Sequence, residues 1–154
     1  MLETPEILQT DPKRLAFVRL CILREQIQQV MGPGLNELKA EVGAQGVAAE
    51  GPWFTHHMRM DSEVFDFEIC VPVTAPVVSK GRVRPGEWPA MRVARAIYHG
   101  PYGGLPAAWG EFNAWVDAEG LKPAPDIWEV YAAGPDASPE PDDWRTELYK
   151  PLLD

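Results

Sequence analysis

The sequence predicts an α+β domain with an antiparallel sheet, two main helices and a central cleft. Three observations support this prediction: an internal repeat, short apolar runs typical of strands, and two stretches with helical periodicity that each end at a glycine. They indicate two copies of one β-α-β-β unit related by pseudo-two-fold symmetry.

The internal repeat appears when the chain is shifted against itself. A shift of 74 residues aligns 17–57 with 91–131 without a gap, and five of the ten positions in 37–46 are identical between the copies. A shift of 79 aligns 65–72 with 144–151, so the second copy carries an insertion of 79 − 74 = 5 residues in its 134–143 loop. We therefore expect one domain over residues 1–154, with a first repeat at about 14–76, a linker at 77–89 and a second repeat at about 90–153.

The first repeat begins with a β-branched and apolar run at 17–23, which predicts a strand. The stretch 34–42 has apolar residues at i, i+3 and i+7 and predicts a helix, with Gly46 in its left-handed cap position. Two further strands are expected at 53–58 and 64–73.

The second repeat follows the same order. Strand residues are expected at 91–97, and apolar residues from Leu105 to Val116 recur at i, i+4, i+7 and i+11, as in a helix that ends at Gly120. Strands at 127–132 and 144–152 complete the unit.

Composition and charge exclude several classes of protein. The 154 residues include 23 acidic and 14 basic side chains, so the formal charge is −9, and a negative surface repels nucleic acid. No apolar run is long enough to cross a membrane, and no leader segment opens the chain. Cys21 and Cys70 lie in apolar runs, which predicts free buried thiols and a cytoplasmic protein. We expect a monomer or homodimer.

The segment from Trp128 to Tyr131 contains the most informative polar residue. On a strand, Glu129 and Tyr131 point to one face, and the same spacing recurs in Glu147 and Tyr149. Because an unpaired charge is costly to bury, Glu129 either lies on a solvated face or faces a partner. In the second case, carboxylates and aromatic rings form a pocket suited to a flat or cationic ligand.

Other polar residues give weaker signals. His56 and His57 alternate on a strand and so are poor joint metal ligands, and no metal site or cofactor is expected. The glycine-rich turn 99–104 matches neither a P-loop nor a dinucleotide fingerprint, and we interpret it as a turn whose Tyr102 lines the cleft. The basic residues of the linker (Lys80, Arg82 and Arg84) are expected to be solvated.

These features together resemble the GyrI-like small-molecule-binding superfamily, which includes effector-binding domains of AraC-type and MerR-type multidrug-responsive regulators. The resemblance rests on the turn His99-Gly-Pro-Tyr102, the helix end Ala118-Glu-Gly-Leu121, the strand 125–131 and the closing segment 146–152. About fifteen residues precede the first strand, too few for the helix-turn-helix module of such regulators, so we expect a stand-alone domain.

The resemblance implies a set of ligand-binding residues. In such domains a glutamate at the position of Glu129 sits at the floor of an aromatic pocket and meets lipophilic cations. Some stand-alone members are hydrolases of cyclopropane-bearing compounds, and Glu129 would then be the catalytic acid/base group. The expected ligand-binding residues are Glu129, Tyr131, Glu147, Tyr149, Tyr98, Tyr102, Trp53 and His57.

Three functions are therefore open. The leading hypothesis is a binding protein that senses or sequesters a flat, lipophilic, aromatic or cationic small molecule. The second is a hydrolase that uses the same glutamate. The third is a protein-interaction inhibitor of a DNA-handling enzyme, whose acidic surface imitates phosphates.

Overall fold

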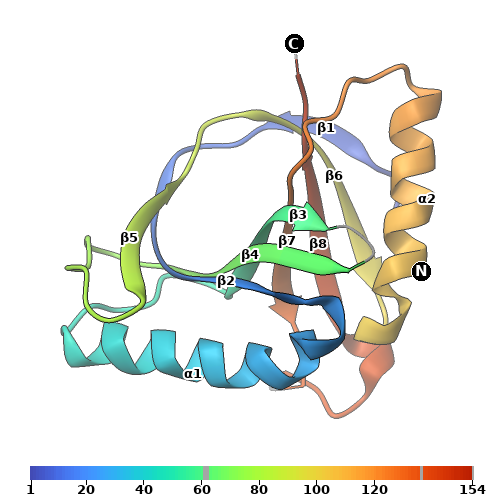
Figure 1. Ribbon diagram of the computed structural model, residues 1–154. Helices are drawn as coiled ribbons and strands as arrows, with labels where there is room; N and C mark the ends of the chain where they lie inside the picture. The colour runs from blue at the N-terminus through green and yellow to red at the C-terminus, as the bar shows by residue number, and fades with distance from the viewer. Residues whose placement is uncertain (61–62, 136, 154) are drawn as a thin grey trace. The chain divides into compact units, whose positions relative to one another are not determined.

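The computed structural model describes residues 1–60, 63–135 and 137–153, which fold as two compact units (Figure 1). Unit 2 is the continuous segment Asp11–Pro89, whereas unit 1 combines Met1–Thr10 with Ala90–Asp154. Each unit contains one long helix and a set of antiparallel strands. The predicted α+β class with antiparallel strands and two main helices is confirmed. The pseudo-two-fold relation and the central cleft stay predictions.

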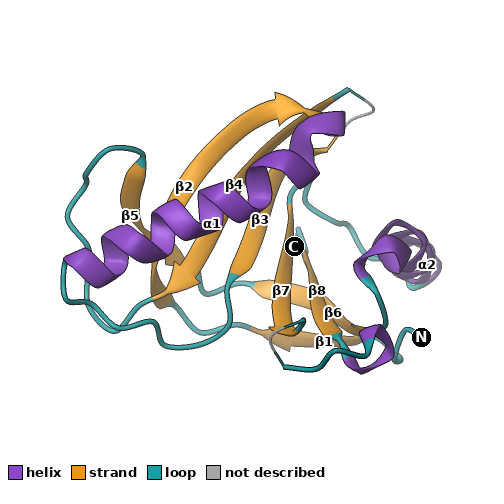
Figure 2. Cartoon of the chain, turned by 90° about the horizontal axis from the view of Figure 1, so that it is seen from below, coloured by secondary structure: helices purple, strands orange, loops and turns teal. Residues whose placement is uncertain are grey.

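Unit 2 contains one long helix and four strands, in the sheet order β3-β4-β2-β5. The chain runs through β2 (Lys13–Leu23), a short 3-10 turn at Arg24–Gln26, α1 (Ile27–Ala44), β3 (Phe54–Met60), β4 (Val64–Pro72) and β5 (Val83–Trp88). Figure 2 shows α1 crossing β2 and β4. One face of this sheet is therefore covered by the helix.

The core of unit 2 lies between α1 and the central strands. Val18 and Leu20 of β2, Phe67 and Ile69 of β4 and Leu38 of α1 are all buried. The helix approaches closely at Gly34, where an added Cβ would lie 2.7 Å from Cδ1 of Ile69. Glycine at this position therefore permits the tight packing of helix on sheet.

Unit 1 has the sheet order β1-β6-β8-β7. Its elements are β1 (Glu6–Gln9), β6 (Arg92–His99), a 3-10 turn at Tyr102–Gly104, α2 (Leu105–Ala118), β7 (Ile127–Ala133), a 3-10 turn at Pro141–Asp143 and β8 (Arg145–Pro151). The core of the unit packs one stripe of α2 against the middle of the sheet; its buried members include Ala108, Trp109, Phe112, Val116, Ala94, Ala96 and Leu148.

The helix ends agree with the sequence prediction, but the start of α1 does not. Gly46 and Gly120 have φ of 71° and 70°, the left-handed conformation that a helix cap favours in glycine. The first helix begins at Ile27, seven residues before the predicted stretch 34–42, and contains Pro33 in its interior. Ile27, Val30 and Met31 pack against the core, and this tertiary contact supports the additional turns.

Two segments expected to be connections are strands. The predicted linker 77–89 contains β5, which pairs with β2 from Val83↔Val18 to Trp88↔Lys13. The segment before the first predicted strand contains β1, which pairs with β6 and therefore belongs to the unit formed by the second repeat. Both are edge strands, whose pairing depends on partners distant in sequence. The predicted insertion at 134–143 includes residue 136, which lies outside the described residues.

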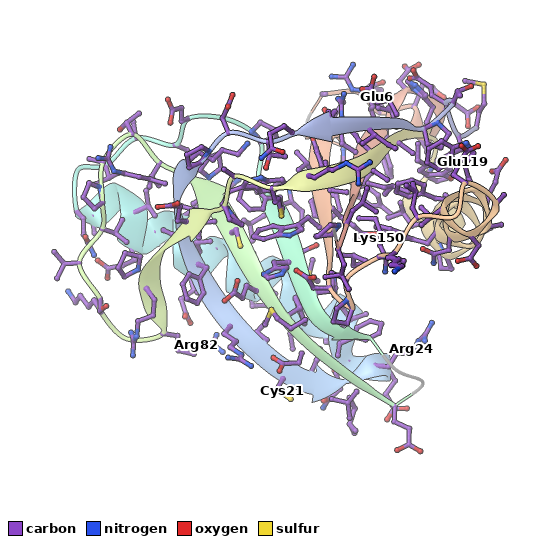
Figure 3. All side chains as sticks on the ribbon, turned by 90° about the horizontal axis from the view of Figure 1, so that it is seen from above. Glu6, Cys21, Arg24, Arg82, Glu119 and Lys150 are labelled. Carbon is purple, nitrogen blue, oxygen red and sulfur yellow. The ribbon has the colours of Figure 1, made fainter. Side chains whose placement is uncertain are left out.

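One of the two predicted buried thiols is buried and the other is exposed. Cys70 is buried, and burial raises the pKa of its thiol well above the usual value. Cys21 is exposed, contrary to the prediction, and its side chain points away from β2 (Figure 3). Its backbone partner is Asp66, so Cys21 lies on the sheet face opposite α1. Among the described helices, none combines the length and hydropathy of a membrane span.

Candidate functional site

The carboxyl group of Glu129 is the centre of a buried hydrogen-bonded cluster in unit 1. The Nε1–H group of Trp109, on α2, donates to Oε2 of Glu129 at 2.6 Å. The hydroxyl group of Tyr131, on the same strand as Glu129, donates to Oε1 at 2.8 Å. All three side chains are buried, with 7% of Glu129 exposed. The solvated alternative for Glu129 is therefore wrong.

The position of Glu129 follows from strand alternation and register. Glu129 pairs with Leu148 on β8, and Leu148 pairs with Ala96 on β6. Residues paired across antiparallel strands point to the same face, and Leu148 and Ala96 belong to the core beneath α2. The Glu129 carboxyl group therefore faces the helix, where Trp109 meets it.

Burial and hydrogen bonding act in opposite directions on this group. Loss of water raises the pKa of Glu129, while the hydrogen bonds from Trp109 and Tyr131 lower it, and the net result is a raised pKa. Both of these donors are neutral, so they stabilise the carboxylate without carrying a positive charge. A cation placed next to Glu129 would stabilise the ionised form further.

Two more aromatic residues extend the cluster toward the turn between β6 and α2. The ring of Tyr102 contacts the ring of Tyr131 edge-on, with centroids 5.8 Å apart, and the ring of Trp144 at 5.0 Å. Tyr98 lies beneath this turn and donates its hydroxyl hydrogen to the carbonyl oxygen of Pro101 at 2.9 Å. We name Trp109, Glu129, Tyr131, Tyr102 and Trp144 the Glu129 cluster.

The second predicted Glu-x-Tyr pair does not join this cluster within unit 1. Glu147 pairs with Val130, and Tyr149 pairs with Trp128, so both point to the sheet face opposite α2. There Tyr149 donates a hydrogen bond to Glu147 at 2.8 Å, and Arg95 lies 3.3 Å from the same carboxylate. Arg95 also pairs with Glu6 of β1. Glu147 and Glu129 therefore lie on opposite faces of the sheet, because Glu147 is next in sequence to Leu148, the partner of Glu129. The expectation that Glu147 and Tyr149 add to the ligand site stays a prediction.

The remaining predicted residues, Trp53 and His57, belong to unit 2. The ring of His57 stacks on Phe67 at 5.1 Å and meets Phe65 edge-on at 5.8 Å. Burial, and secondarily the charge of His56, lowers the pKa of His57 to about 4, so its imidazole is neutral at physiological pH. His56 points to the other face and lies 3.2 Å from Glu68. The predicted separation of the two histidines is confirmed.

Unit 2 has a surface groove that the sequence did not indicate. It has a volume of about 570 Å³ and lies between α1 and the turn before β5. Arg82, expected to be solvated, forms a bidentate ion pair there with Glu37, with both N–O distances at 3.0 Å. The groove contains none of the predicted ligand-binding residues. Among the described residues, no group of three or more His, Cys, Asp or Glu side chains is arranged to hold a metal ion.

Trp109 is the principal residue that sequence reasoning missed. Its position in the apolar stripe of α2 predicts a core residue, and most of its side chain is indeed packed in the core. Only the indole N–H group distinguishes it, because a buried tryptophan usually donates this hydrogen to an acceptor. The sequence signal for this hydrogen bond was the combination of a tryptophan in the apolar stripe of one helix and a glutamate in an apolar strand.

The fold is that of a small α+β domain with two main helices and antiparallel strands. The chain belongs to the family described as the GyrI-like small molecule binding domain, whose match covers residues 3–153. No curated protein matches the sequence.

Several solved structures share this fold at low sequence identity. The C-terminal domain of EcmrR has a TM-score of 0.86 at 19% identity, with 98% of each chain covered. In the EcmrR–DNA complex the TM-score is 0.83 at 20% identity, and the match covers 98% of this chain but 57% of that one. SAV2435, solved bound to tetraphenylphosphonium, has a TM-score of 0.66 at 10% identity, with coverage of 98% and 94%. The domain fold is therefore found both in a larger DNA-bound protein and in a protein of similar length.

Proposed function

We propose that this domain binds a lipophilic aromatic cation at the Glu129 cluster and so senses or sequesters it. The observation that carries the proposal is the buried carboxylate held between the indole of Trp109 and the phenol of Tyr131. A cation next to Glu129 offsets the cost of burying the negative charge. The rings of Tyr131 and Tyr102 supply faces for stacking and cation–π contact.

A structural neighbour supports this choice of ligand class. SAV2435 has the same fold and was solved with tetraphenylphosphonium, a bulky aromatic cation. Tetraphenylphosphonium is therefore the first probe to test, and tetraphenylborate is its matched control because it has nearly the same shape and the opposite charge. Preference for the cation over the anion would show that charge, and not hydrophobicity alone, selects the ligand.

The decisive experiment compares two glutamates on opposite faces of one sheet. By calorimetry, Glu129→Gln should bind tetraphenylphosphonium at least tenfold more weakly than the wild type, because the ligand loses its opposite charge in a buried site. Glu147→Gln makes the same chemical change on the face opposite α2. It should alter affinity by less than about twofold. Equal losses in both variants would indicate a general charge effect and would contradict the proposal.

Hydrolysis is the second candidate function. A carboxyl group with a raised pKa, 2.8 Å from a tyrosine hydroxyl, has the composition of a general acid/base pair. A protein of this fold from Listeria innocua, described as a hydrolase, has a TM-score of 0.65 at 13% identity, with coverage of 97% and 91%. Catalytic release of product from a cyclopropane-bearing electrophile, lost in Glu129→Gln, would favour this function over stoichiometric binding.

A further inference from the structure

Thr146 places an unusual polar group in the core of unit 1. The residue lies on β8 and is fully buried, with 0% of its surface exposed. Across the described part of the chain, its hydroxyl oxygen has no hydrogen-bond partner. A buried hydroxyl without a partner is destabilising, and valine would fill almost the same space at no such cost.

The register places this hydroxyl beside the Glu129 cluster. Thr146 pairs with Tyr98, and Leu148 pairs with both Ala96 and Glu129. Thr146 is two residues from Leu148 and so points to the same face, toward α2. It is therefore the diagonal neighbour of Glu129, a position at which residues of adjacent strands lie roughly 7–8 Å apart and their β-carbons somewhat closer. That separation is suited to a ligand group bridging the two side chains.

We propose that the Thr146 hydroxyl is a specificity-determining group that hydrogen-bonds to a polar substituent of the cationic ligand. The inference rests on the proposed function and names a feature of the ligand that Glu129 does not determine: a hydroxyl, carbonyl or N–H group adjacent to the aromatic cation. A hydroxyl side chain both donates and accepts, so each of these groups satisfies it. The same hydrogen bond would remove the free-energy cost that the buried Thr146 hydroxyl imposes on the unliganded protein.

The ligand probes for the test form a matched series. Tetraphenylphosphonium offers no hydrogen-bonding group, whereas its 3-hydroxyphenyl and 4-hydroxyphenyl analogues carry one hydroxyl on an otherwise identical cation. Thr146→Val removes the protein's hydroxyl at almost constant volume, and Thr146→Ser keeps it. We expect Thr146→Val to weaken binding of at least one hydroxyl-bearing probe five- to tenfold and to leave tetraphenylphosphonium within twofold. Thr146→Ser should retain the preference for the hydroxyl-bearing probe.

Stability gives an independent readout. Removing a hydroxyl that lacks a partner should leave the unfolding midpoint of unliganded Thr146→Val unchanged or raise it. A lower midpoint would show that the hydroxyl stabilises the protein itself, and would overturn the inference. The inference would also be overturned if Thr146→Val lost the same affinity for every probe, or lost no affinity for any probe. If tetraphenylphosphonium binds in a Glu129-dependent manner while the probe series shows no selectivity, only the Thr146 inference fails. If no probe binds the wild type, the proposed function fails and the inference fails with it.

Discussion

At the scale of single residues, two opposing effects set the pKa of the Glu129 carboxyl group. Burial raises the pKa of its carboxyl group more than the hydrogen bonds from Trp109 and Tyr131 lower it. The protonated form is thus favoured to a higher pH than for a solvated glutamate. Under the proposed function, a permanent cation would bind the ionised form of Glu129 better than the protonated form, so ligand binding would be linked to proton release.

The affinity for tetraphenylphosphonium should therefore rise with pH. Below the raised pKa of Glu129, each pH unit lowers the ionised fraction and with it the affinity, by up to about tenfold; above that pKa the affinity should level off. The probe carries a fixed charge, so its own titration cannot contribute. Calorimetry at a series of pH values checks this, with Glu129→Gln as the control that should show a flat profile. A wild-type affinity that falls as pH rises would have the wrong sign for this mechanism.

At the scale of elements, the turn between β6 and α2 is closely packed on Tyr98. A Cβ added at Gly104 would clash with the Tyr98 hydroxyl oxygen and would lie 3.0 Å from Cζ. The φ of Gly104 is −87°, so the backbone itself accepts any residue. At Gly103, one residue earlier, an added Cβ meets no atom within 4 Å. This turn positions Tyr102, and its packing therefore bears on the Glu129 cluster.

These two glycines make a matched pair of substitutions. Gly104→Ala should lower the free energy of unfolding by about 1–3 kcal/mol, because the buried Tyr98 ring must move or the turn must shift. Gly103→Ala should change it by less than about 0.5 kcal/mol, as surface substitutions usually do. Urea unfolding of both variants gives the comparison. Similar losses at the two positions would mean that backbone freedom, and not the Tyr98 contact, requires glycine here.

At the scale of the whole molecule, unit 2 is one continuous segment inserted between the two sequence segments of unit 1. The chain leaves unit 1 after Thr10 and returns at Ala90. Close to this junction, the backbone N–H of Thr10 donates to the carbonyl oxygen of Met91 at 2.8 Å, and the N–H of Met91 donates to the Thr10 hydroxyl at 3.0 Å. β1 then pairs with β6 from Gln9 to Glu6. The first residues of the chain thus complete the sheet of unit 1.

Deleting residues 1–9 should therefore affect the two units differently. Without β1, the backbone groups of β6 on that side lose their partners, so β6 and β8 should exchange amide hydrogens faster and the protein should aggregate more readily. β2 and β4 should keep their protection because they pair with each other and β1 pairs with β6. Hydrogen exchange followed by peptide makes the comparison. Uniform loss of protection over both units would contradict this prediction. As a control, Glu6→Gln keeps β1 but removes the ion pair between Glu6 and Arg95, and it should change the exchange rates little.

The sequence contained enough information to predict most of the elements. Hydrophobic periodicity and the repeat placed both helices, and Gly46 and Gly120 marked their ends, because these signals are local. The edge strands β1 and β5 were missed. Each gains its stability from a partner far along the chain, β6 or β2, and leaves no local pattern that separates a strand from a connection.

By itself the sequence predicted the fold class, the resemblance to the family and Glu129 as a candidate residue, because hydrophobic periodicity, the repeat and a charged residue in an apolar strand are all visible along the chain. It left open whether Glu129 is solvated or buried. Only the tertiary structure decided which groups meet that carboxylate. Trp109 reaches it from α2, while Glu147 points to the opposite face, since the register of β7 on β8 sets the side of each residue. The sequence likewise could not show that the Thr146 hydroxyl has no hydrogen-bond partner among the described residues, because hydrogen-bond partners depend on three-dimensional neighbours.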